Sequence, residues 1–199
     1  IAALVGDNEF VAATIARDAK EGELFWEDRH KLSAIAKRTS GFKMNEDVVI
    51  PMDRMPDFAL FLERLNLGMS AAAYRHAMQE VGRLPGFPME DRDFNREFSL
   101  ASRIAQGDDP AQDMTDDELA ARAGNFLRGL EEKYPRLASK IAKIADYMRA
   151  SRIVVASHMH AGDGNCHVNF PVNSNDPLMM EQAVEAAMQA MAMAQELGG

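Results

Sequence analysis

The chain has 199 residues, of which 47% are hydrophobic, and its formal net charge is −9 at pH 7. This length and apolar content suit a single globular domain, while the acidic balance argues against a nucleic-acid partner, which would need clustered Lys and Arg. No apolar run approaches the roughly 20 residues of a membrane-spanning helix. The single cysteine excludes an internal disulfide and favours a reducing, cytoplasmic setting.

The first third of the chain predicts helices around one short strand. Apolar residues recur at helical spacing in residues 8–20 and 24–40. A β-branched run at residues 48–50, ended by a proline, indicates a strand. A further apolar stripe predicts a third helix from about residue 56, which can extend as far as Val81.

The middle of the chain predicts more helices. Residues 84–115 are rich in proline, glycine and charge and indicate a loop region with one short helix at 95–105. The segment Thr115-Asp-Asp-Glu118 has the pattern of a capping box and predicts a helix to about Lys133. Another helix is expected to begin at Pro135, because proline is tolerated in a first turn.

Strands return near the end of the chain. Residues 152–157 and 167–172 favour strands, and residues 177–197 favour a final helix. The order of elements predicts an α+β domain, with helices packed on a small, mainly antiparallel sheet. The chain starts at Ile1 and stops at Gly199 directly after an apolar-periodic segment, so we expect a piece of a longer protein.

The segment between the last two predicted strands carries the chemistry. Asp163-Gly164 is preferred in a two-residue type I′ turn, and a turn there would place His160 opposite His167. Side chains alternate along a strand, so His158 would share that face, with Asn169 opposite it. One tight turn would thus gather three imidazoles and a carboxamide on one surface.

Two facing imidazoles suit a divalent cation such as zinc, with at least one further ligand, a carboxylate by preference. The alternative is a hairpin whose histidines hydrogen-bond or face water; three on one face favour the metal. The same register pairs Gly162 with Asn165 and Ala161 with Cys166. Cys166 then faces away from the histidines, which indicates a buried, inert thiol.

Three motifs together resemble a known family. They are His160-Ala-Gly-Asp-Gly-Asn-Cys-His167 followed by Asn169, Phe25-Trp-Glu-Asp-Arg29, and Asn45-Glu-Asp-Val-Val-Ile-Pro51. They are similar to the His-x-Gly-Asp-Gly-Asn-x-His, Trp-x-x-Arg and Asp-Val-x-x-Pro elements of the C-terminal domain of FAD-linked oxidases. That family includes D-lactate dehydrogenases, the glycolate oxidase flavin subunit and D-2-hydroxyglutarate dehydrogenase. The resemblance covers residues 24–66 and 152–199 and makes residues 1–199 one such domain.

The resemblance implies a fold and a set of roles. The fold is a ferredoxin-like cap, with an antiparallel sheet and helices on one face. The parent enzyme oxidises a small D-2-hydroxy acid by hydride transfer to FAD, which a domain absent from this chain binds. His160 and His167 match the metal ligands, Arg29 the catalytic arginine that clamps the substrate carboxylate, and Ser33 and Asn169 further substrate-binding positions. An electron-acceptor partner and a peripheral attachment of the parent protein to the membrane also fit the family.

The resemblance leaves a long helical insertion at residues 68–150 unexplained. This insertion sustains a rival interpretation: a non-catalytic α+β interaction module whose insertion docks a partner. An exposed apolar patch on residues 68–150, together with a hairpin that binds no metal, would favour that alternative interpretation.

Overall fold

The computed structural model describes residues 16–24, 42–108, 114–160 and 162–199. The chain divides into two compact units, residues 1–40 and 41–199. In the first unit, residues 19–24 are helical. The helices predicted at 8–20 and 24–40 lie mostly outside the described residues.

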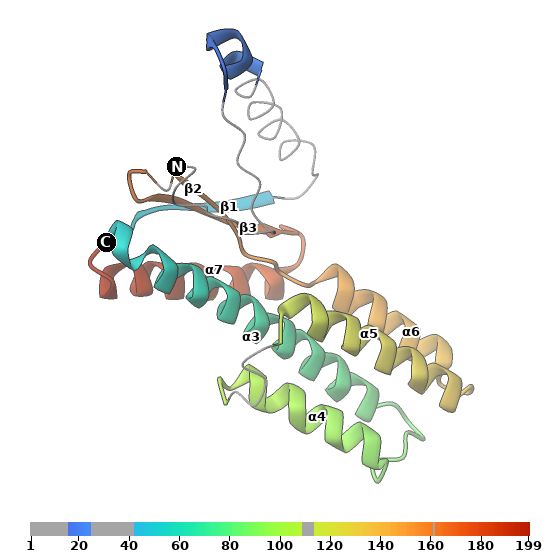
Figure 1. Cartoon of the computed structure of the whole chain (residues 1–199). Coiled ribbons are helices and arrows are strands. Elements are labelled where there is room, and N and C mark those ends of the chain that lie inside the picture. Colours follow the sequence, from blue (N-terminus) through green and yellow to red (C-terminus); the bar gives the residue numbers. More distant parts are fainter. Residues whose placement is uncertain (1–15, 25–41, 109–113, 161) are drawn as a thin grey trace, which may run out of the picture. The chain divides into compact units, whose positions relative to one another are not determined.

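The second unit contains a three-stranded antiparallel sheet covered by helices on one face. The strands are β1 (Phe42–Val49), β2 (Ala156–His160) and β3 (Asn165–Val172), with β3 in the middle. Figure 1 shows α3 (Met55–Gly82) and α7 (Pro177–Glu196) along the same side of this sheet. A β-α-β-β-α order with β3 between β1 and β2 is that of a ferredoxin-like layer, so the predicted fold class is confirmed.

The alternation of side chains on β3 determines which face the helices cover. Cys166, Val168 and Phe170 are each fully buried, and they pack in one cluster with alanines of α7 and the first half of α3. The residues between them, among them His167 and Asn169, point to the opposite face and are only partly buried. We call this layer of strands, α7 and the start of α3 the sheet region.

The rest of the second unit is a bundle that we call the helical region. It consists of α3 from Leu67 onward, α4 (Arg92–Ala105), α5 (Asp116–Lys133) and α6 (Ala138–Ala150). The capping box predicted at Thr115 and Glu118 is present, with both reciprocal hydrogen bonds formed. The helix predicted at 95–105 begins three residues earlier, because Asp91 caps it by accepting from the backbone N–H groups of Asp93 and Phe94.

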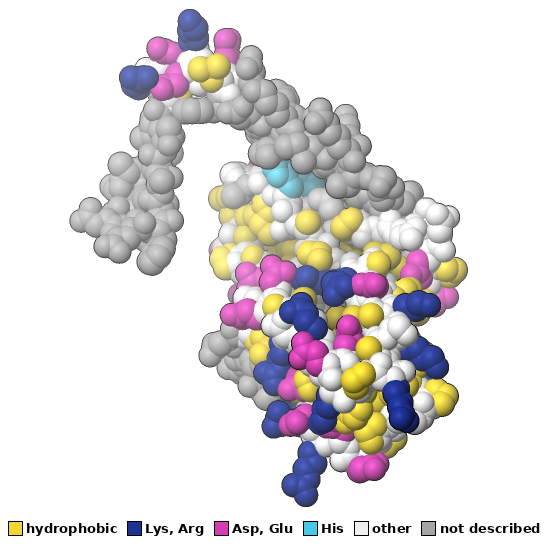
Figure 2. Space-filling model, turned by 90° about the vertical axis from the view of Figure 1, so that its right-hand side faces the viewer, with side chains coloured by type: hydrophobic (Ala, Val, Ile, Leu, Met, Phe, Trp, Pro, Cys, Tyr) yellow, Lys and Arg dark blue, Asp and Glu magenta, His cyan; other side chains and the backbone are white. Residues whose placement is uncertain are grey.

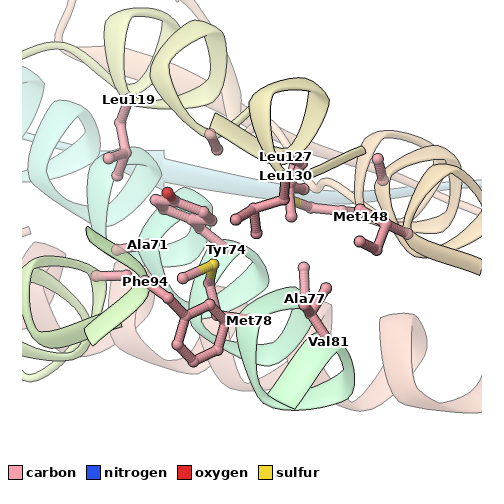
Figure 3. Packing of buried hydrophobic residues seen from close by; sticks show 14 of the residues in the cluster. Ala71, Tyr74, Ala77, Met78, Val81, Phe94, Leu119, Leu127, Leu130 and Met148 are labelled. Carbon is pink, nitrogen blue, oxygen red and sulfur yellow. The ribbon is translucent and has the colours of Figure 1, made fainter. Parts of the chain in front are cut away.

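Helix α3 belongs to both regions and joins them without a break. Phe58, Leu62 and Leu65 pack on the sheet, whereas the buried residues from Leu67 to Val81 pack among the other helices. Figure 3 shows Tyr74 and Met78 of α3 in the space that it shares with α4 and α5. No helix among the described residues is long and apolar enough to cross a membrane.

Two of the predicted strands have different bounds in the structure. β1 starts at Phe42, well before the β-branched run at 48–50, because its whole length pairs with β3. The strand predicted from residue 152 begins only at Ala156. The backbone of Val155 instead bonds to a side chain: its N–H donates to Asn66 Oδ1 at 2.7 Å, and its carbonyl accepts from Asn66 Nδ2 at 2.9 Å.

Candidate metal and substrate site

The β2–β3 hairpin brings the three histidines together, but in a register two residues away from the predicted one. His158 lies opposite His167, His160 opposite Asn165, and Met159 opposite Cys166. The predicted pairing of His160 with His167 is therefore wrong. The pairs Gly162–Asn165, Ala161–Cys166 and His158–Asn169 are wrong for the same reason. A shift by an even number of residues keeps every side chain on its own face, so the three histidines still share a surface.

The turn explains the shift in register. Residues 161–164 lie between the strands, and Asp163 lacks the positive φ that a type I′ turn requires, while Gly164 has φ +76°. The Gly164 carbonyl accepts a hydrogen bond from the Ile50 N–H at 2.8 Å. A Cβ at position 164 would lie only 2.3 Å from the Ile50 carbonyl oxygen. Contact with the end of β1 therefore overrides the local preference of Asp-Gly.

The three imidazole rings lie close together but form no metal site among the described residues. The rings of His158 and His167 are stacked with centres 6.1 Å apart, and the ring of His160 stands edge-on to each at 5.4 Å. With Zn–N bonds of about 2.0–2.1 Å, two imidazoles on one ion have ring centres roughly 5 Å apart. Among the described residues, no three His, Cys, Asp or Glu side chains are already arranged around one point. The donor types fit zinc, but the side chains would have to move to converge on one ion.

Asp47 is a site residue that the motifs did not identify. It lies opposite His167 across the β1–β3 pair, and its Oδ1 is 2.6 Å from His167 Nδ1. An ionised carboxylate can only accept, so Nδ1–H donates, and the lone pair of a neutral His167 is on Nε2. This arrangement resembles the carboxylate–histidine pairs that orient metal-binding imidazoles.

Asn169 lies on the same face and has unused hydrogen-bonding capacity. Its Nδ2 makes long hydrogen bonds of 3.4 Å to the carbonyls of Ala156 and His167. Its Oδ1 is shielded from solvent and has no hydrogen-bond partner. A buried, unpartnered amide oxygen is unusual in a folded protein, so Asn169 has an acceptor that the described part of the fold does not satisfy.

We call His158, His160, His167, Asp47 and Asn169 the histidine face. Figure 2 shows histidine side chains together at one end of residues 42–199, whereas Lys and Arg side chains are spread over the other part of this surface. On the opposite face of the sheet, Cys166 is buried, and burial raises the pKa of its thiol. The predicted orientation of Cys166, away from the histidines, is confirmed.

The structure locates only some of the predicted site residues. His160, His167 and Asn169 are brought to one face of the sheet. Arg29 and Ser33 lie outside the described residues, so their roles remain predictions. His158 was expected on the same face as the two proposed ligands, and it is the cross-strand partner of His167. Asp47 was visible only as part of a strand motif, because its partner is 120 residues away in the chain.

Comparison with known proteins assigns a family to this arrangement. The sequence model described as FAD linked oxidases, C-terminal domain, matches residues 1–78 and 133–199. These two segments make up well over half of the chain and include both the histidine face and the residues around Arg29. No curated protein and no solved structure gives a significant match.

Proposed function

The chain belongs to the family of C-terminal domains of FAD-linked oxidases, and from this premise we propose that it is the substrate side of a dehydrogenase that oxidises a small D-2-hydroxy acid. The observation that supports the proposal is the histidine face: three imidazoles, a carboxylate and a carboxamide on the face of the sheet that α3 and α7 leave open. A structural hairpin needs no such convergence of polar groups.

Within the proposal, His160 and His167 are the protein ligands of a divalent metal, and His158 is the third imidazole within reach. Asp47 holds the His167 ring and leaves the lone pair of the neutral imidazole on Nε2, because Nδ1–H is committed to the carboxylate. When bound, the metal supplies Lewis-acid polarisation of a substrate oxygen, and FAD supplies the two-electron acceptor.

The remaining side chains would bind and orient the acid. We propose that Arg29 clamps the substrate carboxylate, because a planar guanidinium donates two parallel hydrogen bonds. Ser33 would donate to the same acid, and Asn169 would direct its amide toward a polar group of the substrate. All three would hold the substrate against the metal site without taking part in electron transfer.

FAD itself would be bound mainly by another domain. The sequence contains no Gly-x-Gly-x-x-Gly phosphate-binding loop, and the described polar groups of the histidine face suit a cation and a small acid. We therefore propose a flavin-binding domain of the same parent chain as partner, together with an electron acceptor. The free, buried Cys166 fits a reducing compartment, for which we propose the cytoplasm.

Calorimetric titration of zinc into the 199-residue chain tests whether the histidine face binds a metal. We expect weak, saturable binding that His160→Ala and His167→Ala each abolish. His76→Ala is the matched control, because His76 lies on α3, outside the histidine face. Equal zinc binding by His167→Ala and the unchanged chain would make the hairpin structural and remove the chemical support for the proposal.

Flavin reduction in the flavin-loaded parent enzyme tests the substrate class. D-lactate should bleach the flavin absorbance on rapid anaerobic mixing, and L-lactate should not. His167→Ala should slow this reduction on the order of 100-fold and leave the flavin content unchanged. Reduction by neither enantiomer, or by both at equal rates, would contradict the assignment to D-2-hydroxy acids.

The rival interpretation, an interaction module, finds little support in the described surface. Between residues 68 and 150, the large apolar side chains described as exposed are Met89 and Tyr147. Two such side chains do not form the contiguous apolar patch that a docking surface needs. We propose that residues 68–150 are an insertion that extends α3 and shields one end of the domain; the family match leaves out residues 79–132.

A further inference from the structure

A crevice between α3 and α7 has the features of a second ligand site. It has a volume of about 570 Å³, and residues at the C-terminal end of α4 also line it. Its lining includes Arg64, Gly68 and Arg75 on α3, and Gln182, Glu185 and Gln189 on α7. None of these residues belongs to the histidine face. Sites for small molecules have volumes of about 300–1,000 Å³, so the crevice is large enough to hold one.

Small side chains keep the crevice open. Gly68 and Ala72 lie one helical turn apart on α3, and Ala186 lines the wall formed by α7. A Cβ built on Gly68 would have no atom within 4 Å. The gap lies where the core of the sheet region ends at Leu65 and the core of the helical region begins at Leu67.

Two arginines line this crevice, the exposed Arg64 and the half-buried Arg75. Neither Arg64 nor Arg75 forms an ion pair with any residue that the structure describes, although most other arginines in the described segments do. Arg75 is half-buried, and its Nε is shielded from solvent with no hydrogen-bond partner. A buried guanidinium N–H without an acceptor is costly, and an oxyanion bound beside the Arg75 guanidinium would offset part of that cost through its charge.

The lining narrows the ligand class. A guanidinium binds a planar carboxylate through two parallel hydrogen bonds. Phe61, Leu65 and Ile153 supply apolar lining for a hydrocarbon body. The carboxylate of Glu185 also lines the crevice and disfavours a second negative charge on the ligand.

We propose that this crevice binds a small organic monocarboxylate, with the carboxylate at Arg75 and an apolar chain of several carbons along the wall. The inference does not depend on the proposed dehydrogenase function. It concerns different residues, and circular dichroism serves as an independent check that a variant is folded.

The test is to add hexanoate, hexan-1-ol or inorganic phosphate to the 199-residue chain. Calorimetry measures the binding, and thermal unfolding measures the change in melting temperature. Hexanoate should bind at a single saturable site and raise the melting temperature. Hexan-1-ol lacks the charge and phosphate lacks the apolar body, so each should bind at least 10-fold more weakly. Added salt should weaken hexanoate binding, because part of the attraction is electrostatic.

Two variants test the crevice, one by removing a charge and the other by filling its open space. Arg75→Met keeps the length of the side chain and removes the charge, and should weaken hexanoate binding at least 10-fold. Gly68→Leu places a side chain in the open space and should abolish binding, while leucine favours the helical conformation more than glycine does and protects the fold. Gly129→Ala on α5 is the matched control: its Cβ also meets nothing within 4 Å, and it lies outside the crevice.

The proposal is overturned if hexanoate shows no saturable binding, or binds Gly68→Leu as well as the unchanged chain. Equal affinities for hexanoate and phosphate would overturn the monocarboxylate class. Should Arg75→Met fail to fold, Gly68→Leu and its control still decide the matter.

Discussion

Buried carboxylates in the helical region meet complete sets of partners, whereas the buried amide oxygen of Asn169 in the sheet region meets none among the described residues. Asp91 accepts from Lys133 Nζ at 2.8 Å and from the Tyr134 hydroxyl. Glu97 accepts from two nitrogens of Arg122, at 2.8 and 2.6 Å, and from the Tyr74 hydroxyl at 3.2 Å.

On the histidine face the polar side chains are gathered, and one of them, Asn169, keeps an acceptor that no described residue satisfies. The Oδ1 of Asn169 has no partner, and the imidazoles lie at or near the surface without forming a closed cluster. Similar side chains thus have two uses. Complete hydrogen bonding fixes helices to one another, while unused capacity on an open face is what binding requires. The following five predictions test this contrast, from the largest expected effect to the smallest.

Gly164→Ala should be the most damaging single change. The new Cβ would lie 2.3 Å from a backbone oxygen of Ile50, which cannot move without unpairing the end of β1. We expect a loss of at least about 3 kcal/mol in the free energy of unfolding, measured in urea. Gly107→Ala is the control: its φ of +75° is nearly the same, but its Cβ meets nothing within 4 Å. It should lose only about 1 kcal/mol; equal losses would mean that the contact with Ile50 is unimportant.

Glu97→Ala should destabilise the helical region by about 3 kcal/mol, because it leaves the buried Tyr74 hydroxyl without its acceptor and Arg122 without its ion pair. Urea unfolding measures this effect, with the exposed Glu132→Ala on α5 as control. Zinc binding to the folded variant should be unchanged. Altered zinc binding would show that the two regions are coupled more tightly than their separate cores suggest.

Low pH should destabilise the helical region, because it protonates the Asp91 carboxylate. Burial opposes ionisation of this carboxyl, but hydrogen bonds from Lys133, Tyr134 and the Phe94 N–H outweigh it and lower the pKa from 3.8 to about 2. A depressed carboxyl pKa stabilises the fold above the unfolded value, and this stability is lost as the pH falls from about 4 to about 2. We expect the free energy of unfolding to fall by about 1.5 kcal/mol over this range. This value is lower than the full pKa shift implies, because Lys133 is half exposed and solvent screens its charge.

Comparison of the unchanged chain with Asp91→Asn isolates this pH effect. The difference between their unfolding free energies should shrink steadily from pH 4 to pH 2, as followed by denaturant melts monitored by circular dichroism. A difference that stays constant across this range would show that the Asp91 carboxylate contributes nothing through its charge.

Thr115→Ala should cost about 1 kcal/mol, because it removes the side chain that caps α5 by accepting from the Glu118 N–H. Ser139→Ala, at an exposed position inside α6, removes a hydroxyl without removing a cap and serves as the control. Thermal melts of both variants test the prediction, and equal melting temperatures would dismiss the capping box as a source of stability.

Gly129→Ala should have the smallest effect, a gain of about 0.5 kcal/mol. An alanine restricts the unfolded chain and favours the helix, and the added Cβ meets no atom within 4 Å. Because the change lies in the helical region, zinc binding should be unaffected. A loss of stability in chemical denaturation would show that α5 packs more closely at this position than the structure indicates.

The sequence by itself determined the elements whose signals are local. A capping box acts over three residues, and an apolar stripe repeats every three to four, so α5 and the final helix could be located from neighbouring residues alone. Alternation on β3 likewise indicated which side chains share a face, and this is why Cys166 and His167 were assigned correctly to opposite sides.

Only the tertiary structure decided the register of the hairpin and the partner of His167. The turn depends on a hydrogen bond from Ile50, and the orientation of the imidazole depends on Asp47, which is 120 residues distant in the chain. The strand expected from residue 152 begins only at Ala156, because the backbone of Val155 hydrogen-bonds to the side chain of Asn66. Strand pairing and side-chain partners are contacts between segments far apart in sequence. No short-range pattern can encode them, because the free energy that selects them comes from packing that forms only when the chain has folded.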